Sequence, residues 1–230
     1  MVSWWKKFIP DTFENVPTRE GSVPGIPVSV AQFPARPSSA IESTVRNARR
    51  EDLRACVELI NRTHAGTDLF RPYTVDFLEQ TLDEGFWGGS LEKTGNPALD
   101  WWDSVYGWRD YFVLEENGRI VACAGMWDRG RDVRERWRRI GGTDQKVIAN
   151  ASVLDFGYGA GAEDVMVQLL QRFIGSAHRL GRDYLAVPLD HLPDLASRMA
   201  KFDPEPDNRA LRWTIKDPAI TRPYTDLRYW

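Results

Sequence analysis

The chain has few of the residues that mark metal-binding, membrane or nucleic-acid proteins. Only two cysteines occur among 230 residues, Cys56 and Cys123, and they form neither a metal-ligand spacing nor a disulfide framework. No apolar run approaches the roughly 18 residues of a membrane-spanning helix, and residues 1–10 lack the apolar core of a signal peptide. The net charge is −3, whereas binding nucleic-acid phosphates requires a clustered basic face. We therefore predict a cytoplasmic protein that binds neither nucleic acid nor membrane.

The first 42 residues differ in composition from the rest of the chain. Prolines recur too closely for a helix, yet apolar residues lie between them. We interpret residues 1–42 as an extended arm that packs on the main domain or on a second subunit of a homodimer, with disorder as the alternative. Residues 217–230 are predicted to be a tail that docks on a neighbouring surface through its aromatic end.

From residue 43 onward the pattern is orderly and predicts one α/β (α+β) domain over residues 43–216. Thr74 is placed to cap a helix, and Asn117-Gly118 between two apolar runs predicts a β-hairpin. The order favours a mixed central sheet flanked by helices. The predicted elements are strand 44–48, helices 51–64 and 74–84, strands 111–115, 119–127 and 147–156, helix 165–180, strand 183–189, helix 192–199 and strand 210–215.

Two irregular segments interrupt this pattern. Residues 85–109 are rich in Gly, Trp and Asp, and their tryptophans either line an apolar pocket or give the segment its own core. Residues 127–139 are rich in arginine, but acidic residues interleave with them. This second segment is therefore predicted to be a solvated insertion whose charges pair with one another.

The most informative motif is a glycine turn between the apolar strand and the long amphipathic helix. Gly157, Gly159 and Gly161 fall within five residues, directly after the strand that ends near Phe156. A strand, a glycine turn and a helix in this order bring unpaired backbone N–H groups and the positive end of a helix to one point. Such a point binds phosphate or pyrophosphate, so the motif predicts a nucleotide-like cofactor.

The element order together with this turn resembles the GCN5-related N-acetyltransferase (GNAT) superfamily over residues 43–216. The resemblance implies that acetyl-CoA, or another acyl-CoA, binds at the turn and transfers its acyl group to an amine on a small molecule or a protein. It also implies that the pantetheine arm pairs with the strand near Val153 and Leu154. The implied cofactor-binding residues are Val153, Leu154, Gly157, Gly159, Ala160, Gly161 and Ala162.

The chain departs from the family pattern at two places. The family signature is Gln/Arg-x-x-Gly-x-Gly/Ala, and ending it at Gly161 places Phe156 at the Gln/Arg position. Ending it at Ala162 instead places Gly157 there, so neither register supplies the polar side chain. Many members also carry a tyrosine acid on the helix after the fifth strand, where this chain has none between His191 and Asp203. The first departure predicts weakened or altered cofactor binding. The second predicts that another group protonates the CoA thiolate, or that the reaction is slow or absent.

The remaining candidates surround the turn and the first two helices. Asp155 is the best-placed general base for an amine, with stabilisation of the turn as the alternative. Tyr158 is a candidate proton donor or adenine-stacking residue, and packing explains it equally well. The predicted substrate-binding residues are His64, Arg71, Tyr73 and Trp127. The first three lie where the resemblance implies that the acceptor binds, and Trp127 ends the strand 119–127.

Three classes of function follow, in decreasing order of support. The first is an N-acetyltransferase with a divergent active site. The second is a catalytically impaired protein of the same fold that binds acyl-CoA or a partner. The third is a Rossmann-type dinucleotide-binding protein. It is disfavoured because the N-terminal half lacks repeated βαβ units, and because no acidic residue about 20 residues beyond the turn lies at a matching strand end to bind a ribose.

Overall fold

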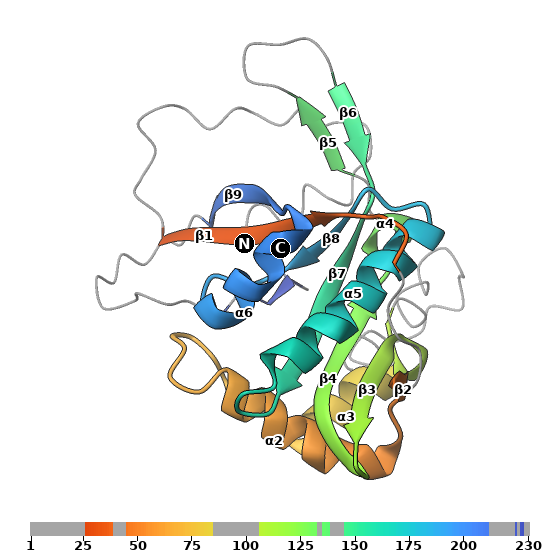
Figure 1. Cartoon of the computed structure of the whole chain (residues 1–230), viewed down its shortest axis with the longest axis vertical. Coiled ribbons are helices and arrows are strands. Elements are labelled where there is room, and N and C mark those ends of the chain that lie inside the picture. The colour runs from red at the N-terminus through yellow and green to blue at the C-terminus, as the bar shows by residue number, and fades with distance from the viewer. Residues whose placement is uncertain are drawn as a thin grey trace.

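The computed structural model describes residues 26–38, 45–84, 106–132, 135–138, 145–211, 224, 226 and 227. Its centre is a 7-stranded mixed sheet with the strand order β2-β3-β4-β7-β8-β1-β9 (Figure 1). Only β7 and β8 pair in parallel, and the other neighbouring strands are antiparallel. The strands are β1 (Ile26–Pro34), β2 (Val45–Asn47), β3 (Tyr111–Glu116), β4 (Arg119–Trp127), β7 (Asn150–Tyr158), β8 (Tyr184–Val187) and β9 (Glu205–Leu211).

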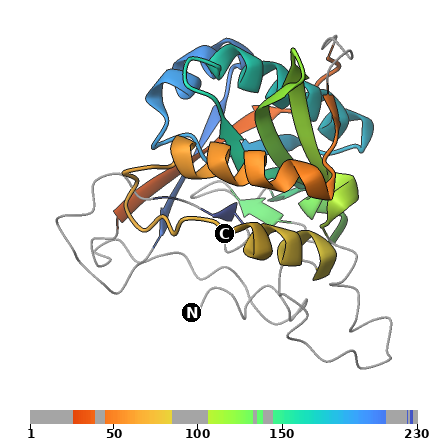
Figure 2. The same ribbon diagram turned by 90° about the horizontal axis from the view of Figure 1, so that it is seen from below.

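Helices cover both faces of the sheet, which confirms the predicted fold class. The helices α5 (Glu163–Arg179) and α6 (Pro193–Met199) share a core with one face. The helices α2 (Leu53–Thr63) and α3 (Val75–Glu84) share a second core with the other face (Figures 1 and 2). On α5 the buried residues recur at helical spacing, as the apolar pattern predicts: Met166, Leu169, Leu170, Phe173, Ile174 and Ala177.

Local signals for turns and caps were reliable. Asn117 and Gly118 have φ angles of 51° and 73°, as a tight hairpin between β3 and β4 requires. The Phe77 amide donates a hydrogen bond to Thr74 Oγ1 at 3.1 Å, so Thr74 caps α3 as predicted. A short 3-10 helix, η1 (Arg50–Asp52), precedes α2, so the helix predicted to begin at residue 51 starts with a tighter turn.

Part of the segment predicted as an arm belongs to the sheet itself. The strand β1 pairs antiparallel with β8 on one side and with β9 on the other. Val30 and Phe33 of this strand are completely buried. The sheet therefore begins before residue 43, the predicted start of the domain.

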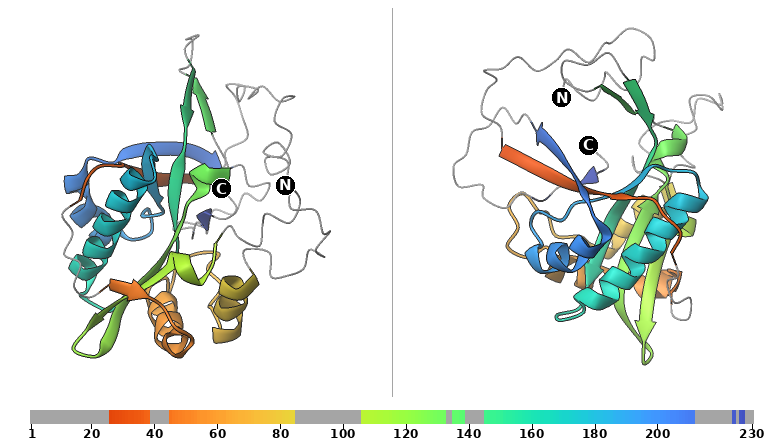
Figure 3. Two further views of the ribbon diagram at one scale, coloured as in Figure 1. Left: turned by 90° about the vertical axis from the view of Figure 1, so that its right-hand side faces the viewer. Right: turned by 45° about the horizontal axis from the view of Figure 1, so that its top comes forward.

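The charged segment between β4 and β7 forms a small substructure of its own. It contains a short helix, α4 (Arg129–Asp132), and a two-stranded sheet of β5 (Glu135–Arg138) and β6 (Gln145–Ile148). This hairpin projects from one end of the main sheet (Figure 3). The apolar run predicted as one strand is divided, because β6 ends at Ile148 and β7 begins at Asn150.

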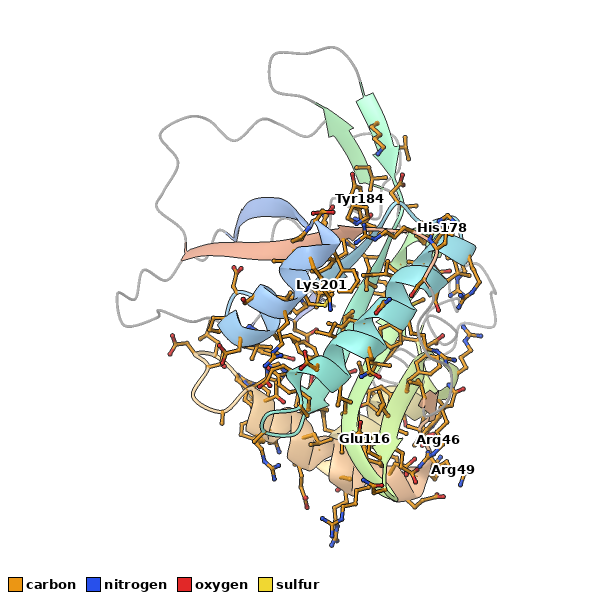
Figure 4. All side chains as sticks on the ribbon, in the orientation of Figure 1. Arg46, Arg49, Glu116, His178, Tyr184 and Lys201 are labelled. Atoms are coloured by element: carbon orange, nitrogen blue, oxygen red, sulfur yellow. The ribbon has the colours of Figure 1, made fainter. Side chains whose placement is uncertain are left out.

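The two ends of the sheet are distinct. Arg46, Arg49 and Glu116 lie at one end, whereas Tyr184 and His178 lie at the other, near the β5–β6 hairpin (Figure 4). The N-terminus of α5 is therefore at the end far from that hairpin. Among the described helices, none is both long and apolar enough to cross a bilayer.

Candidate functional site

The turn between β7 and α5 is an exposed cluster of backbone donors. Ala160 and Gly161 are exposed, and Gly161 has a φ of 72°, which favours glycine. The residue at the N-cap of α5 is Ala162, which supplies no side-chain hydrogen bond. The first N–H groups of a helix have no carbonyl partner within it. This end of α5 can therefore hold an anion, as the sequence predicts.

Charged side chains modify this anion site. Glu163 and Asp164 occupy the first turn of α5 and oppose a bound anion. Arg198 of α6 reaches them, with its guanidinium 2.7 Å from Asp164 Oδ1 and 4.0 Å from Glu163 Oε2. Arg198 thus places a positive charge beside the first turn of α5.

The ladder between β7 and β8 ends several residues before this turn. They pair in parallel only from Asn150 with Tyr184 to Ser152 with Ala186, although β7 continues to Tyr158. The backbone of β7 from Val153 onward is therefore outside the described β7–β8 ladder. The ladder thus ends just before Val153 and Leu154, with which the resemblance implies that the pantetheine arm pairs.

A pair of buried histidines bridges β7 and the segment that follows β8. His64 Nε2 lies 2.9 Å from the carbonyl oxygen of Phe156, and His64 Nδ1 lies 2.8 Å from His191 Nε2. A carbonyl only accepts, so His64 donates through Nε2 and accepts at Nδ1 from His191 Nε2–H. Tyr224, from the predicted tail, packs its ring against both imidazoles.

We expect this pair to make the stability of the protein dependent on pH. Burial lowers the pKa of His64 to about 4, against smaller opposing effects of the Phe156 carbonyl and Asp226. The unfolded chain, with a histidine pKa near 6.5, binds a proton that the native state does not bind. The free energy of unfolding should therefore fall by about 2–3 kcal/mol as the pH drops from 6.5 to about 4.

Urea denaturation between pH 4 and pH 7.5 measures this dependence. In His64→Gln, which keeps a donor and an acceptor but does not titrate, the slope over this range should flatten. The exposed His178 offers a matched control, because His178→Gln should keep the wild-type slope. An unchanged slope in His64→Gln would contradict the assignment.

Asp155 lies in a β-bulge and is held by two tyrosines. Residues 155 and 156 together oppose one residue of β4, and Asp155 has a φ of 48°. Its side chain is buried, and it accepts hydrogen bonds from the hydroxyls of Tyr73 at 2.8 Å and Tyr106 at 3.1 Å. A third hydroxyl, that of Tyr111, donates to the Asp155 carbonyl oxygen at 3.0 Å. The predicted base and Tyr73 are thus in direct contact.

The other predicted site residues are Arg71, Trp127 and Tyr158. Arg71 is exposed, and Trp127 is buried on β4 opposite Ser152. Tyr158 ends β7, and burial, with smaller effects of Glu163 and Asp194, raises its pKa to about 12. Its phenol is therefore neutral and can donate a proton or a hydrogen bond.

Gly157 and Gly159 differ from Gly161 in their surroundings. Gly157 lies inside β7, where a Cβ atom would be 2.3 Å from the Ile60 nitrogen, so this glycine permits close packing of α2 on the sheet. The Gly159 amide donates to the Val121 carbonyl oxygen at 2.9 Å, and the Ala162 amide donates to the Gly159 carbonyl oxygen at 3.0 Å. The exposed part of the turn is thus residues 160–161.

Sequence patterns did not place three further residues at the site: His191, Tyr106 and Arg198. His191 meets His64 across 127 positions of the chain, and Tyr106 meets Asp155 across 49. Arg198 contacts α5 from a different helix. Only His191 could have been noticed from the sequence, because the chain has just three histidines.

No family model matches the chain, and no curated protein matches it. Solved structures are similar to it at low identity. The N-myristoyltransferase of Saccharomyces cerevisiae with bound myristoyl-CoA is 14% identical, with a TM-score of 0.43 over 76% of this chain and 37% of that one. An N-acetyltransferase of Staphylococcus aureus Mu50 is 20% identical, with a TM-score of 0.41 over 68% and 79%.

A transcriptional regulator of Bacillus halodurans C-125 is 14% identical, with a TM-score of 0.44 over 76% of this chain and 97% of that one. The chain thus spans little more than a third of the yeast enzyme. Apart from β1, α4, β5 and β6, the elements of the main sheet follow the predicted order, β2-α2-α3-β3-β4-β7-α5-β8-α6-β9. Similarities this distant leave the ligand and the reaction to be inferred from the residues of the chain.

Proposed function

We propose that this protein binds an acyl-CoA, with acetyl-CoA as the expected cofactor, and transfers the acyl group to an amine. The observation that carries the proposal is the exposed, uncapped N-terminus of α5, which follows a part of β7 that lies outside the β7–β8 ladder. The N–H groups of residues 160–161 and of the first turn of α5 would hold the pyrophosphate. Arg198 would offset the acidic side chains there.

The residues near Asp155 could carry out the proton transfers. As the amine nitrogen bonds to the acyl carbon, it must lose a proton, which Asp155 can accept through the hydroxyl of Tyr73 or Tyr106. The carbon–sulfur bond breaks in the same exchange. The CoA thiolate would take a proton from Tyr158, whose phenol is neutral at pH 7.

The second candidate is a protein that binds acyl-CoA without turning it over. Glu163 and Asp164 weaken the attraction of the anion site, and each oxygen of Asp155 already accepts a phenol. The helix α6 also lacks the tyrosine acid of the family. Calorimetric titration with acetyl-CoA, CoA and NAD, paired with thiol release over a panel of amines, separates the candidates.

Binding of acetyl-CoA with thiol release supports the transferase, and binding without release supports the second candidate. Tight binding of NAD without CoA would overturn both. These readouts use the same protein and differ only in the added ligand.

A negative charge introduced at residue 161 tests whether the pyrophosphate binds at this turn. A Cβ at Gly161 would meet no atom within 4 Å, and aspartate and asparagine both tolerate its positive φ. The two substitutions have the same shape but differ in charge. We expect Gly161→Asn to bind acetyl-CoA within a few-fold of the wild type and Gly161→Asp to bind it about tenfold more weakly, because like charges repel.

Gly181, at the other end of α5, provides the matched control. Its φ is 68°, and a Cβ there would likewise meet no atom within 4 Å. Gly181→Asp and Gly181→Asn should bind acetyl-CoA equally well. Equal affinities of the two Gly161 variants would show that no anion binds at this turn.

A further inference from the structure

One edge of β7, close to the turn before α5, lies outside the strand pairing of the sheet. The Gly159 amide donates to the Val121 carbonyl oxygen at 2.9 Å and so faces the β4 side. Because successive residues of a strand direct their backbone groups to alternate sides, those of Tyr158 face away from β4. The strand β8 lies on that side of β7, but the described β7–β8 ladder ends at Ser152.

The end of α2 occupies this edge with two side chains. Thr63 Oγ1 accepts a hydrogen bond from the Tyr158 amide at 2.8 Å and donates one to the Tyr158 carbonyl oxygen at 3.2 Å. His64 Nε2 donates to the Phe156 carbonyl oxygen at 2.9 Å, two residues earlier on the strand. A hydroxyl that both accepts and donates replaces the carbonyl oxygen and N–H of a paired amide. Thr63 thus takes the place that a neighbouring amide would have.

Contacts beyond β7 hold His64 in this position. His191, which follows β8, lies 2.8 Å from its other ring nitrogen, and both imidazoles are buried. The ring of Tyr224 packs against both. An extended molecule therefore cannot pair with β7 at Phe156 and Tyr158 while Thr63 and His64 stay bonded there.

The segment after α2 is strained in this arrangement. Ala65 and Gly66 are exposed, and Gly66 has a φ of 73°. Leu69 has a φ of 66°, although it is not glycine, and its side chain is 49% exposed. Backbone strain of this kind is found at segments that change conformation. A movement of the last turn of α2 would let Leu69 leave this conformation.

We propose that Thr63 and His64 close this edge of β7 in the free protein and that the pantetheine arm of an acyl-CoA displaces them. An arm that runs from a pyrophosphate at residues 160–161 toward Val153 passes Tyr158 and Phe156. It carries two secondary amides, each with the carbonyl oxygen and N–H that Thr63 replaces. The contact of α2 with β7 is thus autoinhibitory. The inference rests on the proposed function, because it concerns the cofactor of that reaction.

Thr63→Val tests the proposal, because valine keeps the shape of threonine and lacks the hydroxyl. We expect calorimetry to show that this variant binds acetyl-CoA about three- to tenfold more tightly than the wild type, since the closed state loses about one net hydrogen bond. Thr63→Ser keeps the hydroxyl and should bind as the wild type does. ADP has a pyrophosphate but no pantetheine arm, so all three proteins should bind it equally.

A second buried hydroxyl, on α3, supplies the matched control. Thr81 Oγ1 donates to the Phe77 carbonyl oxygen at 2.8 Å. Without ligand, Thr81→Val and Thr63→Val should both melt about 2–4 °C below the wild type, but only Thr63→Val should gain affinity for acetyl-CoA. Equal acetyl-CoA affinities of Thr63→Val and the wild type would overturn the proposal. An equal gain in affinity for ADP would overturn it as well.

Stopped-flow binding to the unaltered protein gives a second test. Because the edge must open before the arm can pair, the observed rate should level off as the acetyl-CoA concentration rises. The limiting rate should be higher in Thr63→Val. Rates that rise linearly with the same slope in both proteins would contradict the opening step.

The outcomes separate this proposal from the proposed function. If acetyl-CoA binds the wild type and Thr63→Val equally, the closed edge fails and the acyltransferase assignment stands. If Thr63→Val binds more tightly but no amine releases thiol, the closed edge stands and the acyltransferase assignment fails. If neither protein binds acetyl-CoA, both fail.

Discussion

Gly157→Ala is expected to destabilise the protein by on the order of 5 kcal/mol, close to the whole stability of many domains. A Cβ atom at this position would lie 2.3 Å from the Ile60 nitrogen and 2.5 Å from the Leu59 carbonyl carbon. Both are backbone atoms of α2, so no side chain can rotate away. The helix would have to move off the sheet, and the bonds of Thr63 and His64 to β7 would be lost with it.

Gly159→Ala is the matched control, two residues further along. A Cβ there would lie 3.7 Å from the Ala162 Cβ, which is ordinary van der Waals contact, and the φ of Gly159 is not positive. Urea or guanidinium denaturation followed by circular dichroism measures both variants. A Gly157→Ala protein within about 1 kcal/mol of the wild type would show that α2 does not pack against this strand as described.

The three glycines explain why the site was only partly predictable. In the sequence they form one motif, but Gly157 permits close packing, Gly159 donates to Val121 and Gly161 has a positive φ. The spacing of the glycines cannot show which glycine has which role, because the role of Gly157 depends on α2, a helix about 100 positions earlier in the chain. For the same reason, the sequence could not decide whether the family signature ends at Gly161 or at Ala162.

Elements with strong local signals were predicted well. The apolar period of α5, the Asn117-Gly118 turn and the Thr74 cap each depend on residues within one element. The strand β1 had no such signal, because Pro27 and Pro34 argue against a central strand. Its place between β8 and β9 depends on pairing partners about 150 or more positions away.

The environment of Asp155, in the β-bulge, could also be predicted only in part from the sequence. The residue was predicted as a base from its place beside the turn, and Asp adopts a positive φ more readily than most residues. Its two phenol partners could not be predicted together. Tyr73 precedes α3, whereas Tyr106 precedes the 3-10 helix η3 (Trp108–Asp110), and only the folded sheet brings them to one carboxylate.

Asp155→Asn is expected to lower the rate of thiol release at least 100-fold and to leave acetyl-CoA affinity within a few-fold. Asparagine has nearly the same shape, but an amide cannot accept the proton of the amine. Because the Asn side chain still offers one oxygen, Tyr73 or Tyr106 can keep a hydrogen bond to it. Steady-state thiol release over amine concentration and pH, with calorimetry for the cofactor, measures both quantities.

The two tyrosines separate proton transfer from support of the fold. If protons pass through one phenol, either Tyr73→Phe or Tyr106→Phe should lower the rate nearly as far as Asp155→Asn, and the other should lower it much less. If the tyrosines only hold Asp155 in the bulge, both variants should lower stability by about 1–3 kcal/mol with similar, small effects on rate. Gly125→Ala provides an independent check, since its Cβ would lie 1.7 Å from the Tyr106 hydroxyl and would displace that ring from Asp155. If Asp155→Asn releases thiol at the wild-type rate, Asp155 is not the base. The hydrogen bonds of Tyr73 and Tyr106 to Asp155 are then purely structural.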